Sequence, residues 1–210
     1  MTFDVEAFRL YLISDRKLVP EGNSFLETIE QVLIGGVRAL QLREKDLPPD
    51  ELFACALTLR TLTDSYGASL LINDRIDVAM AVGADGVHLG EHSLPTSAAR
   101  RILGNKAIIG RSTHRVEDIV QAAAEGADFV TFSPIYFTPS KAPYGEPQGL
   151  DALRHACTTS PLPVLALGGI RQDRIREVRS AGAAGIALIS ALLKSADPAS
   201  AARSLLAEMY

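Results

Sequence analysis

The sequence predicts an α/β fold in which eight parallel strands close into a barrel surrounded by helices. Short apolar runs of strand length alternate along the chain with longer amphipathic stretches, and this alternation is typical of a parallel sheet with crossover helices. Eight such units within 210 residues favour a compact (βα)8 TIM barrel over an open doubly wound sheet. No linker, low-complexity tract or change in composition interrupts the pattern, so we expect residues 1–210 to form a single domain.

The strands are expected at residues 10–14, 39–42, 70–72, 86–89, 107–109, 129–132, 164–167 and 185–188. The helices are expected near residues 24–34, 50–64, 75–82, 96–103, 116–124, 150–157, 171–180 and 196–208. A repeated junction supports this order, because glycines at 36, 83, 126 and 182 each follow a helix end and precede a strand. Glycine at such a position suits a left-handed helix cap.

The composition narrows the function classes. With 47% hydrophobic residues and a net charge of −4, the chain has material for one substantial core but lacks the basic footprint of a nucleic-acid or membrane-surface binder. No run approaches the roughly 18 apolar residues of a membrane span. The acidic N-terminal residues do not resemble a signal peptide. We therefore expect a soluble cytoplasmic protein with neither nucleic acid nor membrane as a partner.

The end of the second strand carries the most informative polar residues. Alternation along a strand would place Gln41, Arg43 and Lys45 on one face. Unpaired charges are costly to bury, so two cations and an amide at a strand end indicate an anionic ligand. The alternative is a solvated strand end whose cations pair with Glu44 or Asp46.

The third strand is followed by Asn73 and Asp74. Either side chain could cap the next helix. In the functional interpretation, Asp74 binds a divalent metal, because hard cations prefer oxygen ligands.

The fourth strand contains His88, which we interpret as a hydrogen-bonded interior residue. After the fifth strand, Ser112 or Thr113 is expected to cap a helix, and His114 is placed better for proton transfer.

The loops after the last three strands indicate a lid and a phosphate site. Residues 133–149 form a long loop with hydroxyls, prolines and Lys141, typical of a hinged lid, with a disordered insert as the alternative. Gly169 and Ser190 follow the seventh and eighth strands, where TIM barrels commonly bind a phosphate through backbone N–H groups. This backbone site would suit a monophosphate. A second site would suit a diphosphate, which could be held by Arg43, Lys45, Lys141 and a metal on Asp74. Two such sites would fit two phosphorylated substrates, one of which loses pyrophosphate.

Six segments together resemble the thiamine-phosphate synthases, a family that shares its superfamily with the thiazole tautomerases. These segments are 11–15 (YLISD), 41–45 (QLREK), 72–75 (INDR), 83–90 (GADGVHLG), 138–141 (TPSK) and 166–170 (ALGGI). The resemblance implies a transferase that joins hydroxymethylpyrimidine diphosphate to thiazole phosphate, with Mg²⁺ as cofactor and release of pyrophosphate. Catalysis would then consist largely of positioning and charge stabilisation.

The resemblance also implies roles for individual residues. The catalytic candidates are Arg43, Lys45, Ser112, Lys141 and His114, and the metal candidates are Asp74 and Glu91. The substrate-binding candidates are Gln41, Asn73, Thr138, Ser140, Gly169, Ile189 and Ser190. Gln41 would hold the pyrimidine, and the backbones at Gly169 and Ser190 would hold the thiazole phosphate.

The sequence departs from the family pattern where a second magnesium-binding aspartate is usual. Ser93 occupies that position, which makes Glu91 the substitute candidate. Ser133 and Phe137 also replace the usual glycine and proline. These departures leave two alternatives: a thiazole tautomerase that uses His114 without a metal, or a non-catalytic phosphate-binding barrel. For the assembly, the frequency of dimers among oligomers favours a homodimer.

Overall fold

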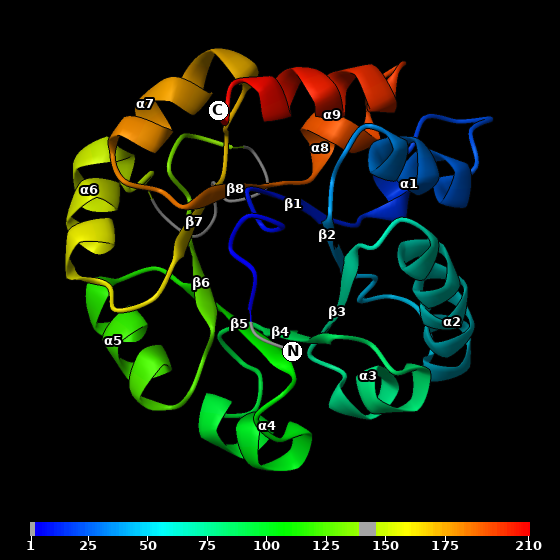
Figure 1. The fold of residues 1–210 in the computed structure, drawn as a ribbon, viewed down its shortest axis with the longest axis horizontal. Helices are drawn as coiled ribbons and strands as arrows, with labels where there is room; N and C mark the ends of the chain where they lie inside the picture. The colour runs from blue at the N-terminus through cyan, green and yellow to red at the C-terminus, as the bar shows by residue number, and fades with distance from the viewer. Residues whose placement is uncertain (1–2, 139–145) are drawn as a thin grey trace.

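The computed structural model describes residues 3–138 and 146–210. Eight parallel strands form a closed barrel in which each strand pairs with the next and β8 pairs with β1 (Figure 1). The strands are β1 (Leu10–Ile13), β2 (Ala39–Leu42), β3 (Ser69–Asn73), β4 (Gly86–Leu89), β5 (Ile108–Thr113), β6 (Phe129–Phe132), β7 (Val164–Leu167) and β8 (Gly185–Leu188). The predicted TIM barrel is confirmed.

Helices surround the barrel as an outer ring (Figure 1). They are α1 (Phe25–Ile34), α2 (Pro49–Ser65), α3 (Ile76–Val82), α4 (Thr96–Leu103), α5 (Val116–Ala124), α6 (Gly149–Thr159), α7 (Ile175–Ser180), α8 (Ser190–Leu193) and α9 (Pro198–Ala207), with 3-10 turns η1 (Arg16–Leu18) and η3 (Gln172–Arg174). No helix was predicted at residues 190–193, where α8 lies, and a single helix was predicted over residues 171–180, where η3 precedes α7. None of the helices in the described residues has the length and apolar content needed to cross a membrane.

Alternation along the strands divides the buried residues into two sets. One set fills the barrel and includes Tyr11, Ile13, Leu71, Phe129 and Leu165. The larger set lies between the strands and the helices. The barrel is therefore a packed core rather than a pore, and its polar interior residues lie toward the carboxyl ends of the strands.

The repeated junction has the predicted backbone. Glycines 36, 83, 126 and 182 all have positive φ, at 105°, 66°, 92° and 99°. A side chain would be strained there, so glycine allows each helix to end and turn into the following strand.

An aspartate after the second of these glycines ties three elements together. Asp85 Oδ2 accepts a hydrogen bond from the Leu70 backbone N–H at the start of β3, at 2.8 Å. The same oxygen accepts from Arg60 Nη1 of α2, at 2.5 Å. Asp85 itself immediately precedes β4.

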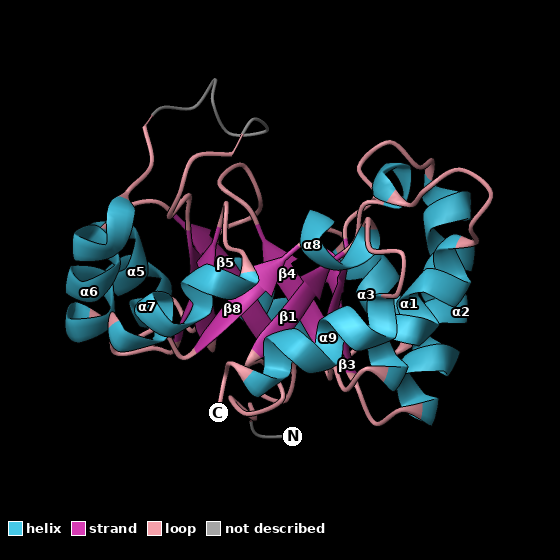
Figure 2. Cartoon of the chain, turned by 90° about the horizontal axis from the view of Figure 1, so that it is seen from above, coloured by secondary structure: helices cyan, strands magenta, loops and turns pink. Residues whose placement is uncertain are grey.

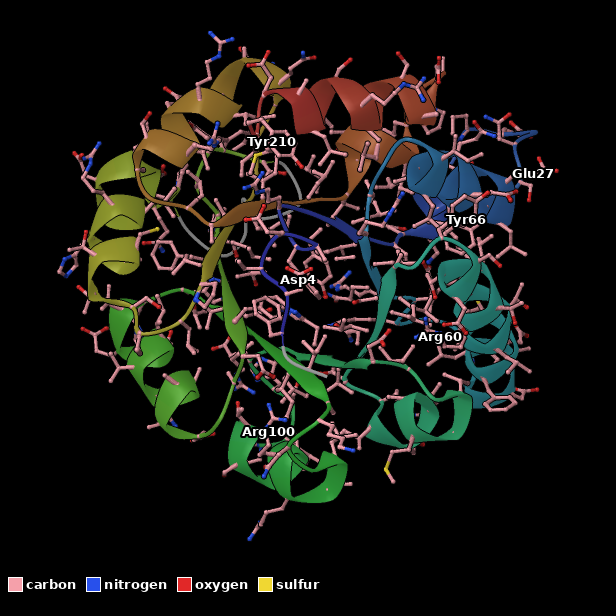
Figure 3. The ribbon with its side chains drawn as sticks, in the orientation of Figure 1. Asp4, Glu27, Arg60, Tyr66, Arg100 and Tyr210 are labelled. Atoms are coloured by element: carbon pink, nitrogen blue, oxygen red, sulfur yellow. The ribbon has the colours of Figure 1, made fainter. Side chains whose placement is uncertain are left out.

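Asp128 repeats this arrangement before β6. Its Oδ2 accepts from the Ile109 backbone N–H of β5 and from Arg100 Nη2 of α4, each at 2.7 Å. Arg60 and Arg100 are both labelled in Figure 3, on their respective outer helices. The repeat therefore fixes a helix and two strands at the end of the barrel opposite to the strands' carboxyl ends.

We expect Asp85→Ala to lower the free energy of unfolding by about 3 kcal/mol, because it leaves a largely buried guanidinium without its main partner. Chemical denaturation checks this value. Asp64→Ala is the matched control, because Asp64 pairs with the same Arg60 at 2.5 Å but its side chain is 66% exposed. The control should change stability by less than about 1 kcal/mol. Equal losses would contradict the role of Asp85.

The carboxyl ends of all eight strands meet at one end of the barrel, which we call the mouth. Figure 2 shows the C-terminus on the side opposite to the segments that flank residues 139–145. Those segments follow β6, so they lie at the mouth. The loops expected to carry chemistry therefore share one end of the molecule.

Candidate functional site at the mouth of the barrel

Gln41 is the buried polar residue of β2. Its side chain is only 1% exposed, and its Nε2 donates to the Tyr11 hydroxyl at 3.1 Å. Gln41 therefore faces the barrel interior, as alternation predicts. Strand β2 ends at Leu42, so alternation does not govern the next residues.

The two acids after β2 pair with Arg16 and Lys17. Among the described residues they do not pair with Arg43 or Lys45, as a solvated strand end would require. Glu44 is buried and accepts from the Ser14 hydroxyl at 2.6 Å and from Arg16 Nη1 at 3.1 Å. Asp46 pairs with Arg16 at 2.7 Å and with Lys17 at 2.8 Å. Hydrogen bonds from Arg16 and Lys17 hold the pKa of Asp46 well below its usual range.

Arg43 and Lys45 form no ion pair within residues 3–138 and 146–210. Arg43 is half-buried, and its backbone N–H donates to the Ser14 hydroxyl at 2.8 Å. This hydrogen bond holds the backbone of Arg43 in place, and the guanidinium is left to bind a ligand. This arrangement suits an anionic ligand better than a structural ion pair.

Asn73 ends β3, and Asp74 follows it with a φ of 61°. The Asp74 carboxylate accepts from Asn73 Nδ2 at 3.0 Å, from the Gly90 N–H at 3.4 Å, and from the Ser93 hydroxyl. Neither Asn73 nor Asp74 caps α3, whose N-cap residue is Arg75. The capping interpretation was wrong, because the Asp74 carboxylate turns toward the loop after β4.

The described residues contain no group of three or more His, Cys, Asp and Glu side chains arranged to hold a metal ion. Asp74 is bonded to Ser93, whereas Glu91 is exposed and lines a cavity of 370 Å³ with Ser112 and His114. The assignment of Glu91 as a second metal ligand therefore stays a prediction.

Strand β5 continues to Thr113, four residues beyond its expected end at 109. Ser112 and Thr113 consequently lie in the sheet, paired with Thr131 and Phe132, and neither caps α5, whose N-cap residue is Arg115. That expectation was wrong, because strand pairing outweighed the polar character of residues 111–113.

His114 follows β5 directly. Its Nδ1 lies 2.7 Å from the carbonyl oxygen of Ser133. A carbonyl only accepts, so Nδ1 carries the proton and Nε2 is left as the other ring position. His114 is half-buried beside the mouth.

His88 lies inside the barrel, as predicted. Its ring is 2% exposed, with Nε2 3.0 Å from the Ser112 hydroxyl and 3.5 Å from the Thr131 hydroxyl. Burial lowers its pKa from 6.5 to about 3. The imidazole is therefore neutral at pH 7.

The segment after β6 runs beside the end of β7. The N–H groups of Ile135 and Tyr136 donate to the carbonyls of Leu167 and Gly168, each at 3.0 Å. Thr138 is the last described residue of this segment, whereas the candidates Ser140 and Lys141 lie outside the described residues.

Gly169, Ile189 and Ser190 lie where β7 and β8 open toward the mouth. Ser190 begins the short helix α8, and Ile189 is its N-cap residue. A Cβ at Gly169 would lie 2.7 Å from the Phe137 carbonyl oxygen, so only glycine fits. Arg174 Nη1 donates to the Gly169 carbonyl at 2.9 Å. Arg174 was not among the predicted site residues, because it lies five residues after Gly169 and outside the glycine motif.

Fold and site together define a class of protein: a TIM-barrel enzyme whose mouth carries an amide, a carboxylate, and cations that form no ion pair among the described residues. The sequence model of the thiamine monophosphate synthase family matches residues 10–192. The chain belongs to that family.

Individual relatives agree with this membership. A relative from Geobacter sulfurreducens, whose name assigns it provisionally to the thiamine-phosphate synthases, is 53% identical over 95% of this chain and 93% of its own length. The thiamine-phosphate synthase of Synechocystis is 42% identical over 95% of this chain, which spans 57% of that relative's length. A solved thiamine phosphate pyrophosphorylase from Pyrococcus furiosus superimposes with a TM-score of 0.88 at 37% identity, covering 98% of this chain and 96% of that one. These comparisons support a transferase of thiamine biosynthesis and give no support to the tautomerase or the non-catalytic barrel.

Proposed function

We propose that this chain acts as a thiamine-phosphate synthase, joining hydroxymethylpyrimidine diphosphate to thiazole phosphate with release of pyrophosphate. The observation that carries the site assignment is Arg43, a half-buried residue that follows the buried Gln41 and whose guanidinium has no ion pair among the described residues. An amide and a cation two residues apart at one strand end suit a ligand with a polar ring and an anionic tail.

The diphosphate is held by Arg43, Lys45, Asn73, Ser112 and Lys141, and Gln41 holds the pyrimidine. The bond from the pyrimidine methylene carbon to the diphosphate oxygen breaks, and the electron pair leaves with pyrophosphate. The resulting carbocation is captured by the thiazole nitrogen. The cations act by stabilising the negative charge that grows on the leaving group.

The thiazole phosphate is held by backbone N–H groups at Gly169 and at Ile189 and Ser190. The supporting features are the short additional helix α8 after β8 and the absence of a side chain at Gly169. Thr138 and Ser140 are the candidates for contact with the thiazole and the leaving group, and His114 is available to hold a proton at Nε2.

Asp74 is the proposed magnesium ligand, with Glu91 as the candidate for a second. Magnesium sites commonly use one or two carboxylates together with substrate phosphates, so the Asp74 carboxylate and a bound diphosphate fit the ion. Bound Mg²⁺ would neutralise the leaving pyrophosphate. Ser93, bonded to Asp74, orients that carboxylate.

The experiment is a direct assay with pyrimidine diphosphate, thiazole phosphate and magnesium, with the product oxidised to fluorescent thiochrome. Metal-dependent formation of thiamine phosphate is the expected result. Conversion of a thiazole carboxylate phosphate isomer without thiamine phosphate would overturn the proposal in favour of the tautomerase. Inactivity in both assays would favour the non-catalytic barrel.

We further propose that residues 1–210 form one domain, that the enzyme works as a homodimer in the cytoplasm, and that it has no nucleic-acid or membrane partner. The biosynthetic family supports the location, and the commonness of dimers supports the assembly. Light scattering of the purified protein tests the dimer.

A further inference from the structure

A chain of four polar side chains crosses the barrel interior beneath the mouth. Gln41 Nε2 donates to the Tyr11 hydroxyl at 3.1 Å, and that hydroxyl lies 3.5 Å from His88 Nδ1. On the other side of the ring, His88 Nε2 lies 3.0 Å from the Ser112 hydroxyl. We call Gln41, Tyr11, His88 and Ser112 the interior relay. It connects β2, β1, β4 and β5.

The imidazole at the centre of the relay is tightly enclosed. Its centroid lies 5.8 Å from that of Tyr11 and 5.7 Å from that of Phe129. A Cβ at Gly110 would lie 2.5 Å from His88 Nδ1, so only glycine leaves room for the ring. Tyr11 and His88 are 0% and 2% exposed. Water cannot replace a lost hydrogen bond readily in such a place, so the direction of each bond matters.

Counting protons assigns those directions. The Tyr11 hydroxyl accepts from Gln41 and has a single proton to donate, for which His88 Nδ1 is the acceptor. A neutral imidazole with an accepting Nδ1 carries its proton on Nε2 and donates it to Ser112. The Ser112 hydroxyl is then an acceptor toward the interior, and its own proton can point to the mouth.

The two ends of the relay therefore have opposite character. Gln41 uses an amide N–H inside the barrel, and its Oε1 has no hydrogen bond within the part of the chain that the structure describes. Gln41 presents an acceptor and Ser112 presents a donor. The reverse direction would turn the Ser112 oxygen lone pairs toward the mouth, where they would repel an anion.

We propose that Tyr11 and His88 are positioning residues that fix this direction, so that Gln41 accepts from an amino group on the pyrimidine and Ser112 donates to the diphosphate. The inference rests on the proposed synthase function for the identity of the ligand. The direction of the relay belongs to the free protein and can be measured without a substrate.

The first test is nitrogen-15 NMR of the histidine rings in the full-length, ligand-free protein at pH 7. The His88 signals are identified by their absence in His88→Asn. We expect His88 to be protonated at Nε2 and bare at Nδ1. Protonation at Nδ1 would overturn the proposal. This result stands whether or not the protein proves to be a synthase.

The second test is Tyr11→Phe, compared with Tyr66→Phe in steady-state kinetics. Tyr66, labelled in Figure 3, donates its hydroxyl to Glu30 at 3.0 Å on the outer helices. For Tyr11→Phe we expect the KM for pyrimidine diphosphate to rise about tenfold, as for the loss of one buried hydrogen bond. The KM for thiazole phosphate should stay unchanged, and Tyr66→Phe should leave both values unchanged.

Equal rises in both KM values for Tyr11→Phe would indicate general loosening of the barrel and would overturn the proposal. Thermal unfolding of both variants establishes that they fold. If Tyr11→Phe does not fold, the NMR measurement on the wild-type protein still decides the direction of the relay. Absence of synthase turnover in the wild type would instead overturn the proposed function, which distinguishes the two failures.

Discussion

Arg43→Ala is expected to lower kcat/KM for pyrimidine diphosphate by about a hundredfold to a thousandfold while the barrel remains folded. The fold uses the backbone of Arg43, whose N–H donates to the Ser14 hydroxyl at 2.8 Å. Its guanidinium has no ion pair within the described residues. The substitution therefore removes a charge that is free to act on a leaving diphosphate. Steady-state kinetics and circular dichroism measure the two parts of this result.

Arg101→Ala is the matched control, because Arg101 is an exposed arginine on α4 and forms no ion pair among the described residues. It should leave kcat/KM unchanged. Wild-type activity in Arg43→Ala would mean that the diphosphate is bound at another part of the mouth. Loss of the folded circular dichroism signal would mean that the side chain is structural.

The barrel could be predicted from the sequence because each strand and helix has its own local pattern. Residues 39–42, 86–89, 129–132, 164–167 and 185–188 are strands with the predicted bounds. Strand β5 was predicted too short because Arg111, Ser112 and Thr113 are polar. Those residues extend the strand by pairing with β6, and the Thr113 hydroxyl donates to the Thr131 carbonyl at 3.0 Å. The pairing of β5 with β6 cannot be predicted from the local sequence of either strand.

The site could be predicted only in part, for a similar reason. The positions of Gln41 and Arg43 follow from a short motif at a strand end. The burial of Glu44 depends on Ser14 and Arg16, which come from the preceding βα unit. The contact between Asp74 and Ser93 joins the loops after β3 and β4. Alternation past Leu42 could not reveal these contacts, because the chain leaves the strand there.

Only one part of the interior relay could be predicted from the sequence. His88 was predicted to be a hydrogen-bonded interior residue, and it is one. Tyr11 lies in one of the segments that resemble the family, but no role was predicted for it. Its hydrogen bond to Gln41 depends on the pairing of β1 with β2. In that register Tyr11 lies opposite Ala39 and Ile13 lies opposite Gln41. Such a register is a property of the closed barrel and not of either segment.

Asp74→Asn is expected to abolish the magnesium dependence of the reaction and to lower kcat/KM by about a thousandfold, as for the loss of several kcal/mol of charge stabilisation. Asparagine tolerates positive φ, so the backbone at 61° should persist. The side chain also keeps an oxygen that accepts from Ser93. What it loses is the negative charge, which is the property that attracts a magnesium ion. A magnesium titration of the initial rate measures the effect.

Asp77→Asn is the matched control, since Asp77 lies on the neighbouring helix α3, its side chain is 67% exposed, and among the described residues it forms an ion pair with Arg75 alone, at 2.6 Å. Its magnesium titration should follow the wild type.

Ser93→Asp adds a carboxylate beside Asp74 and should lower the magnesium concentration needed for half-maximal rate, because a second hard ligand strengthens the site. An unchanged titration in Asp74→Asn would show that the ion is held elsewhere, and Glu91→Gln would then be the variant to examine. An altered titration in Asp74→Asn together with no effect of Ser93→Asp would show that one carboxylate and the substrate diphosphate already complete the site.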